Sequence, residues 1–216
     1  VGLLNAMGAK IIEVPTIEFA PPTNRKALDD ACNSANTFDW IVFTSAKGVE
    51  AFIERFLALE NDIQSLKHIR FCAVGPATAA KLTDYQLSVS AVPKEHLGEA
   101  VAELLDDYVR GTRVLLPRAD LAGTNLPDAL RHAGADVHDV IAYRTIPVQS
   151  KRHDVYTMLI EKQIDVITFT SASTVRNFVA MMGTPSVPEL LTHTLIATIG
   201  PVTADAARSL GMNVAI

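Results

Sequence analysis

An internal repeat limits the folds open to this chain more than any other feature. Its matched segments, 125 or 126 residues apart, are FDWIVFTSAKGVEAFIERF (38–56) with IDVITFTSASTVRNFVAMM (164–182), FCAVGPATAAKL (71–82) with IATIGPVTADAA (196–207), and residues 3–21 with 126–147, where Gly8 falls on Gly134. Three matched segments in one order are typical of a duplicated structural unit. The chain therefore contains two copies of one unit.

Both copies alternate short apolar runs with amphipathic segments. We expect strands at 11–18, 40–44, 70–74, 88–92, 113–117, 137–144, 165–170 and 195–199. We expect helices at 27–35, 46–57, 77–83, 97–109, 123–133, 152–162, 172–182 and 202–210. This alternation is typical of parallel sheets covered by helices on both faces, so the sequence predicts an α/β protein.

Two proline-rich stretches, IEFAPPT (17–23) and AYRTIPV (142–148), indicate where the chain divides. Proline disfavours central strands, so we expect both stretches to be linkers rather than parts of a lobe. The predicted arrangement is a discontinuous first lobe of residues 1–16 plus 148–216, a second lobe of residues 24–142, and linkers at 17–23 and 143–147. Two chain crossings would then connect two similar flavodoxin-like lobes. A simple division near residue 110 is the alternative.

Composition excludes several classes of protein. The 216 residues are 49% hydrophobic and carry a net charge of −5 with no basic block, which argues against a nucleic-acid surface. No apolar run approaches the roughly 18 residues of a membrane span. Cys32 and Cys72 match neither a disulfide framework nor a metal site, and no signal peptide is visible, so we expect a cytoplasmic protein. Nucleotide-binding glycine motifs are also missing, and the six histidines lack metal-ligand spacing.

The ends of the predicted strands carry the candidate chemistry. Ligands in parallel sheets bind at the carboxyl ends of strands, where this chain has Thr44-Ser45 and Gly75-Pro76 and their repeat copies at 170–171 and 200–201. The first N–H groups of each following helix lack helical partners and favour an anion. Serine and threonine at helix starts are usually only caps, so they do not by themselves identify a specific ligand. The residues alone support a two-lobed protein with an anion-binding cleft.

The same segments resemble the uroporphyrinogen-III synthase family. The likeness rests on WIVFTSAKGVEAF, AVGPATAAKL, VLLPRADLAGTNLPDALRHAGADVHDVIAYRTIP, DVITFTSASTVRNF and IATIGPVTADAARSLGMNV, in the family's order over nearly the whole chain. The resemblance implies two flavodoxin-like lobes joined by a two-stranded linker, with a discontinuous first lobe. The family's opening strand and closing helix are missing, so we expect the protein to extend beyond both ends of this sequence.

The resemblance implies a lyase that needs no cofactor and no metal. Linear hydroxymethylbilane loses water, ring D is attacked at its substituted carbon, and a spirocyclic intermediate recloses with ring D inverted to give uroporphyrinogen III. The substrate is highly anionic, and a protein of net charge −5 cannot hold it by bulk attraction. Local donors must therefore bind it, and lobe closure would bring its two ends together.

Site residues follow from the resemblance position by position. Tyr143, at the family's Tyr-x-Thr position, is the expected catalytic group and helps the hydroxyl to leave as a neutral proton donor. From position alone, a structural role for Tyr143 is favoured over a catalytic one. The expected substrate-binding residues are Thr44, Ser45, Lys47, Gly75, Thr78, Arg118, Ser171, Ala172, Ser173, Gly200 and Thr203. We expect a monomer that contacts the preceding pathway enzyme only transiently.

Two other functions remain open at this stage. One is a non-catalytic relative that binds tetrapyrroles or regulates their synthesis, because a binder would keep the same hydroxyls and glycines. The other is a two-lobed binding protein of the periplasmic type, which an export signal in the full-length gene would favour. Loss of Tyr143 function with binding intact would identify a catalyst.

Overall fold

The computed structural model describes residues 2–95, 97–148, 152–184 and 186–216. The chain forms two compact units, which we call the terminal unit (residues 1–18 with 146–216) and the central unit (residues 19–145). The predicted division into two lobes and two linkers stays a prediction. That each unit folds as an independent domain stays a prediction.

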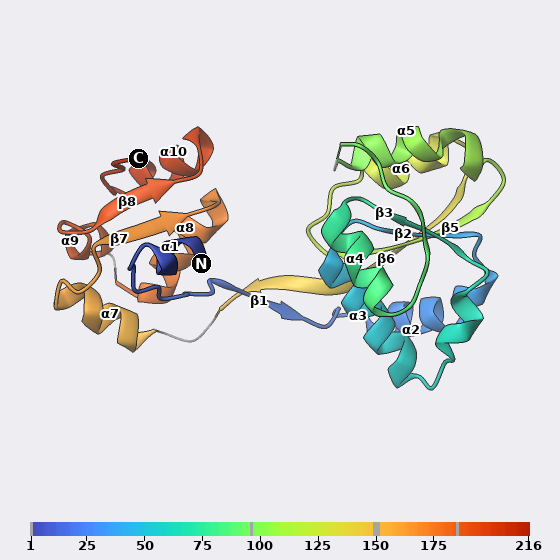
Figure 1. Ribbon diagram of the computed structural model, residues 1–216, viewed down its shortest axis with the longest axis horizontal. Coiled ribbons are helices and arrows are strands. Elements are labelled where there is room, and N and C mark those ends of the chain that lie inside the picture. Colours follow the sequence, from blue (N-terminus) through green and yellow to red (C-terminus); the bar gives the residue numbers. More distant parts are fainter. Residues whose placement is uncertain (1, 96, 149–151, 185) are drawn as a thin grey trace. The chain divides into compact units, whose positions relative to one another are not determined.

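One six-stranded sheet holds the central unit together (Figure 1). Its strands, in spatial order, are β1 (Ile17–Ala20), β6 (Asp136–Pro147), β5 (Arg113–Ala119), β2 (Trp40–Phe43), β3 (Arg70–Ala73) and β4 (Val89–Ala91). The neighbours from β6 to β4 are all parallel. Counted cyclically from β5, these five strands have the order 2-1-3-4-5, which is the flavodoxin-like order. This agrees with the predicted α/β class.

Helices cover both faces of this sheet. They are α2 (Arg25–Asn33), α3 (Ala46–Ala58), α4 (Pro76–Asp84), α5 (Gly98–Val109) and α6 (Asn125–His132), with short 3-10 turns at Ala35–Thr37 and Ile63–Leu66. Figure 1 shows α5 and α6 on one face and α2 and α3 on the other. All four residues of β2 are buried, as expected for a strand covered on both sides. Ile41 and Phe43 join the α3 side of the core, whereas Trp40 and Val42 join the α5 side.

The terminal unit has a smaller parallel sheet. Strand β7 (Val166–Phe169) pairs with β8 (Leu195–Thr198), and Val214 adds a bridge to Ile196. The helices of this unit are α1 (Gly2–Ala6), α7 (His153–Ile160), α8 (Ala172–Met182), α9 (Val187–Leu190) and α10 (Pro201–Ser209). Phe169 and Phe178 lie in its apolar core.

The expected strand at 11–18 is wrong over most of its length. Residues 11–16 have no regular secondary structure, and the strand begins only at Ile17. Pro15 explains part of the difference, because it cannot donate a ladder hydrogen bond. The opposite error occurs at 137–144, where β6 continues to Pro147 because β1 pairs with it. The Val148 N–H donates to the Thr16 carbonyl over 3.2 Å.

The repeat is visible as repeated local geometry. Ser45 and Ser171 cap α3 and α8 from nearly the same extended backbone, with φ of −157° and −161°. Phe43 packs edge-to-face on Phe52 at 5.8 Å between ring centroids, and its counterpart Phe169 packs likewise on Phe178 at 5.5 Å. The backbone conformation after each strand therefore follows from local sequence.

Gly8 and Gly134 share the left-handed conformation, with φ of +87° and +93°. Only glycine adopts it without strain. We expect Gly134→Ala to lower the free energy of unfolding by about 1 kcal/mol, because a Cβ would be strained and would also lie 3.3 Å from Arg110 Cγ. Urea denaturation measures this. Gly8→Ala measures the backbone strain alone, because no atom lies within 4 Å of a Cβ added there. Gly123→Ala is the control, because Gly123 has no positive φ. Equal stability of Gly134→Ala and Gly123→Ala would contradict the prediction.

Candidate functional site

The junction after β2 brings Ser45 and Tyr143 together. Ser45 Oγ accepts a hydrogen bond from the Gly48 N–H over 3.0 Å and forms another with Tyr143 Oη, also at 3.0 Å. Tyr143 comes from β6, so this bond connects strands that lie on either side of β5. From β5 the chain continues to β6 on one side of the sheet, and from β2 it continues to β3 on the other side. The pair therefore lies at the topological switch point, where ligands bind in sheets of this kind.

The approach of α3 to β5 depends on Gly48. A Cβ at this position would lie 3.2 Å from Ser45 Oγ and 3.4 Å from the Pro117 carbonyl oxygen. Thr174 stands at the matching place in the terminal unit. The two copies of the junction therefore share a cap but differ in how closely the helix packs.

Arg118 is buried, and its donors are taken up within the central unit. Its Nε donates to Asp139 Oδ1 over 2.6 Å, Nη2 donates to Asp139 Oδ2, and Nη1 donates to the Gly123 carbonyl. The loop after β5 is fixed further by Asp120, whose N–H donates to the Tyr143 carbonyl over 3.2 Å. The predicted site residue Arg118 therefore holds this loop beside Tyr143. Asp139 was not predicted, because sequence alone does not pair residues on neighbouring strands.

The adjacent ends of β2 and β3 carry further predicted residues. The Val74 N–H donates to the Phe43 carbonyl over 3.0 Å, which places Thr44 and Gly75 at neighbouring strand ends. Pro76 begins α4, and Thr78 is buried in its first turn with 4% exposure. The backbone of Gly75 is extended. The N–H groups of the first turn of α4 are therefore presented at the same edge as Ser45.

Lys47 lies in the first turn of α3. Its Nζ pairs with Glu50 Oε2 at 2.9 Å and stands 5.5 Å from the centroid of the Phe19 ring. The Phe19 ring packs edge-to-face on Tyr143 with centroids 5.5 Å apart. The side chain of Lys47 therefore belongs to the surroundings of Tyr143.

The terminal unit has its own hydroxyl cluster at the start of α8. Ser171 Oγ accepts from the Thr174 N–H at 3.2 Å, lies 3.0 Å from Ser173 Oγ, and hydrogen-bonds Thr174 Oγ1. Ala172 is the first helical residue. At the neighbouring strand end, Gly200 precedes α10, and Thr203 is 4% exposed in its first turn. The predicted residues of this unit thus gather at the carboxyl ends of β7 and β8.

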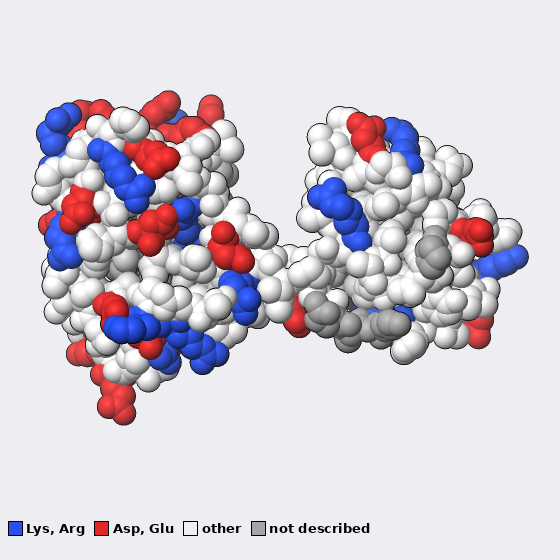
Figure 2. Space-filling model, turned by 180° about the vertical axis from the view of Figure 1, so that it is seen from behind, with Lys and Arg blue, Asp and Glu red and all other residues white. Residues whose placement is uncertain are grey.

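Charges of both signs lie on the face of the molecule that Figure 2 presents, where Lys and Arg are interspersed with Asp and Glu. Within the described ranges, no helix is both long enough and apolar enough to cross a membrane. The same ranges contain no cluster of three or more His, Cys, Asp or Glu side chains that could hold a metal ion.

A cavity of about 360 Å³ lies in the central unit, and sequence reasoning missed it. Its lining residues are Phe19, Ala20, Pro21, Pro22, Arg25, Leu28, Lys47, Ala51, Glu54, Arg55, Ala58, Ala142 and Tyr143. They come from β1 and the loop after it, from α2, from one side of α3 and from β6. No sequence motif marks such a set.

Comparisons with known proteins find relatives of this chain. A family model described as uroporphyrinogen-III synthase HemD matches residues 1–216. A uroporphyrinogen-III synthase of Synechococcus elongatus is 32% identical over 211 residues, which are 96% of this chain and 80% of the relative. A second, from Chlorobaculum parvum, is 28% identical over 218 residues, covering 99% of this chain and 85% of that protein.

Solved structures support the fold. The uroporphyrinogen-III synthetase of Helicobacter pylori gives a TM-score of 0.63 at 18% identity, covering 96% of this chain and 87% of that one. A mutant uroporphyrinogen III synthase of Thermus thermophilus gives 0.54 at 20% identity, covering 99% and 84%.

Fold and junctions together define an α/β protein whose strand ends suit an anionic ligand. The family model and the relatives go further: the chain belongs to the uroporphyrinogen-III synthase family. It is therefore an enzyme of tetrapyrrole synthesis, as the sequence resemblance predicted.

Proposed function

We propose that the chain carries out the reaction of its family, the cyclisation of hydroxymethylbilane to uroporphyrinogen III, with Tyr143 as the group that helps the hydroxyl leave. The observation that carries this proposal is the hydrogen bond between Tyr143 Oη and Ser45 Oγ at the switch point of the central sheet. It supports a tyrosine held in one orientation at the edge where ligands bind.

The proton of Tyr143 is the centre of the mechanism. Ser45 Oγ already accepts the Gly48 N–H, and a hydroxyl has one proton to donate. We assign that proton to the bond with Tyr143 Oη, which leaves the phenolic proton for a ligand. As the C–O bond of the terminal hydroxymethyl group breaks, Tyr143 donates to the departing oxygen and water leaves. The electron pair of the broken bond goes with that oxygen, and the remaining carbon becomes the electrophile that ring D attacks.

Carboxylate binding is proposed for the helix starts in both units. The proposed groups are the side chains or backbone N–H groups of Thr44, Ser45, Lys47, Gly75, Thr78, Ser171, Ala172, Ser173, Gly200 and Thr203. Each lies at a strand end or in the first turn of a helix, where N–H groups lack helical partners. For Arg118 we propose an indirect role, because Asp139 and the Gly123 carbonyl occupy its donors.

A coupled assay tests the proposed function. Hydroxymethylbilane is generated enzymatically, the products are oxidised, and the type I and type III isomers are separated by chromatography. We expect type III in excess of a control without the protein. Only type I at the spontaneous rate would contradict the proposal and favour a non-catalytic relative.

The same assay tests carboxylate binding. Thr203→Ala should lower turnover about fivefold or more without unfolding the protein, because one specific hydrogen bond contributes about 1 kcal/mol or more. Thr192→Ala, an exposed threonine of the same unit, is the matched control. Unchanged turnover of Thr203→Ala would remove Thr203 from the site. A cytoplasmic location and a monomeric state stay predictions from the sequence.

A further inference from the structure

The cavity of the central unit has the form of a small-molecule site. Its volume of about 360 Å³ lies at the lower end of the range typical of such sites, about 300–1,000 Å³. Proline, alanine, leucine and aromatic side chains make up most of its walls, and three cationic side chains and one carboxylate add polar groups. A mainly apolar lining with a few polar or charged groups is typical of small-molecule pockets.

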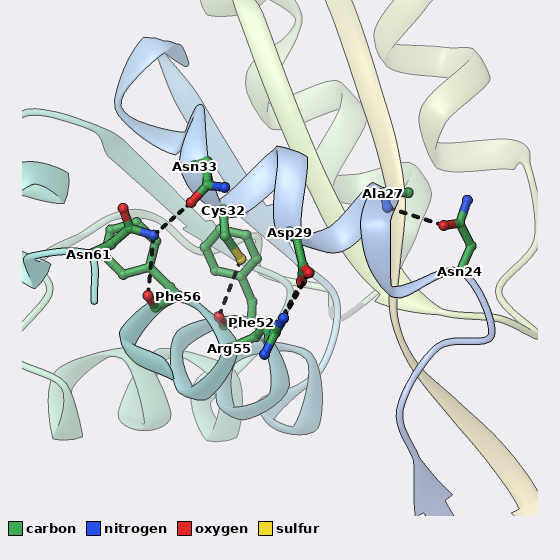
Figure 3. Close-up of polar contacts among 9 residues, drawn as sticks. All are labelled: Asn24, Ala27, Asp29, Cys32, Asn33, Phe52, Arg55, Phe56 and Asn61. Atoms are coloured by element: carbon green, nitrogen blue, oxygen red, sulfur yellow. Dashed lines mark hydrogen bonds and ion pairs between the residues drawn. The ribbon is translucent and has the colours of Figure 1, made fainter. Parts of the chain in front are cut away.

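Two of its walls are fixed to each other. Arg55 on α3 donates two hydrogen bonds to Asp29 on α2, at 2.6 Å and 2.7 Å, as Figure 3 shows. The arginine also lowers the pKa of the Asp29 carboxyl, through these hydrogen bonds first. Cys32 Sγ contacts the Phe52 carbonyl at 3.9 Å, and Asn61 Nδ2 donates to Asn33 Oδ1 at 3.3 Å. The cavity is therefore largely preformed, which reduces the entropy cost of binding.

Phe19 forms an aromatic wall of the cavity, and about half of its surface is exposed. Phe19 is 51% exposed although it packs on Tyr143 and lies beneath Lys47. The part of its ring that lines the cavity can pack against a flat ligand. Such aromatic contacts contribute about 0.5–1.5 kcal/mol beyond the burial of area.

The three cationic side chains of the cavity differ in whether they have an ion-pair partner. Arg55 is held by Asp29, and Lys47 is paired with Glu50. In the part of the chain that the structure describes, Arg25 makes no ion pair or side-chain hydrogen bond. It lies in the first turn of α2, where the helix dipole disfavours its charge. The Asp29 carboxylate acts on this charge, but the hydrogen bonds of Asp29 go to Arg55. A carboxylate in the cavity would offset this charge and form charge-assisted hydrogen bonds.

We propose that this cavity binds one pyrrole ring of the linear tetrapyrrole, with the ring against Phe19 and a ring carboxylate on Arg25 and Lys47. Because Tyr143 forms part of the wall, the bound ring is the terminal ring that carries the departing hydroxyl. This inference rests on the proposed function. It goes further in assigning a ring-binding subsite to β1, α2 and α3, next to the junction that holds Ser45 and Tyr143.

Direct binding of a single ring is the deciding test. The probe is a monopyrrole carrying one acetate and one propionate, and saturation-transfer NMR measures its affinity for the full chain. We expect Arg25→Gln to weaken binding about tenfold, as for the loss of one charge-assisted contact. Lys26→Gln is the matched control, because Lys26 is the next residue on α2 and pairs with Asp30. Equal affinities of Arg25→Gln and wild type would overturn the proposal.

A second pair of variants compares a bulky side chain inside the cavity with one outside it. Ala58 is exposed and lines the cavity, whereas its neighbour Leu57 is exposed and does not. Ala58→Phe should abolish monopyrrole binding and raise KM for hydroxymethylbilane about tenfold, with kcat changed less. Leu57→Phe should match wild type. Unchanged binding in Ala58→Phe would also overturn the inference.

The outcomes separate this inference from the proposed function. If wild type forms the type III isomer but Arg25→Gln and Ala58→Phe behave like wild type, the subsite is wrong and the function stands. If wild type forms only type I, the function fails. The subsite is then supported only when the monopyrrole binds wild type and Lys26→Gln equally and binds Arg25→Gln about tenfold more weakly.

Discussion

Tyr143→Phe should lower kcat about 10- to 100-fold while KM for hydroxymethylbilane changes little. The variant removes one oxygen and keeps the ring, so the contact with Phe19 and the shape of the cavity wall persist. Loss of a donor that acts on the departing hydroxyl costs about 1–3 kcal/mol in barrier height. The measurement is the rate of type III formation in the coupled assay.

Tyr108→Phe is the control for this experiment. Tyr108 is 59% exposed on α5, so its hydroxyl contributes nothing to the proposed mechanism. Ser45→Ala should give a smaller loss than Tyr143→Phe, because the tyrosine then keeps its proton but loses its orientation. The double variant should be no slower than Tyr143→Phe alone, as expected for residues that act as a unit. Full activity of Tyr143→Phe would show that the catalytic assignment is wrong.

Phe52→Ala should lower the free energy of unfolding of the central unit by about 3–5 kcal/mol. Phe52 is fully buried and packs on Phe43 and Phe56, so truncation leaves a cavity in the middle of the core. Phe178→Ala, the variant at the matching position of the repeat, should destabilise the terminal unit by a similar amount. Comparison of the two variants tests whether the two units unfold separately, as the predicted division into lobes requires.

Cysteine alkylation distinguishes the two units. Both cysteines, Cys32 and Cys72, are buried in the central unit, and burial raises the pKa of each thiol to about 12. At pH 8 a folded central unit therefore contains almost no thiolate and should resist iodoacetamide. Opening of the unit exposes ordinary thiols, with a pKa near 8.5, which react. Labelling thus reports the opening of the central unit alone.

Phe52→Ala should raise the labelling rate at least about 100-fold, since each 1.4 kcal/mol is a factor of ten in the opened population. Phe178→Ala should leave it near the wild-type rate. Equal acceleration by both variants would show that the two units unfold as one and would contradict the division into independent lobes.

Local sequence predicted much of the fold and part of the candidate site. The apolar runs placed β2 and β7, and Ser45 and Ser171 are the helix caps expected at their ends. Such features depend on a few neighbouring residues, namely side-chain alternation, a capping hydroxyl and the unpaired N–H groups of a helix start. The repeat and the ordered motifs added the family, which the comparisons confirmed.

Contacts between distant segments were decided only by the tertiary structure. Tyr143 was a candidate in the sequence, but its bond to Ser45 joins residues 98 positions apart. Arg118 was predicted to bind substrate, and only the structure shows that Asp139 on the neighbouring strand pairs with its guanidinium. The cavity gathers Phe19, Arg25 and Tyr143 from three elements, and no spacing rule links them. Sequence determines what each segment can do locally; the order of strands in the sheet determines which side chains meet, because register and packing are properties of the whole unit.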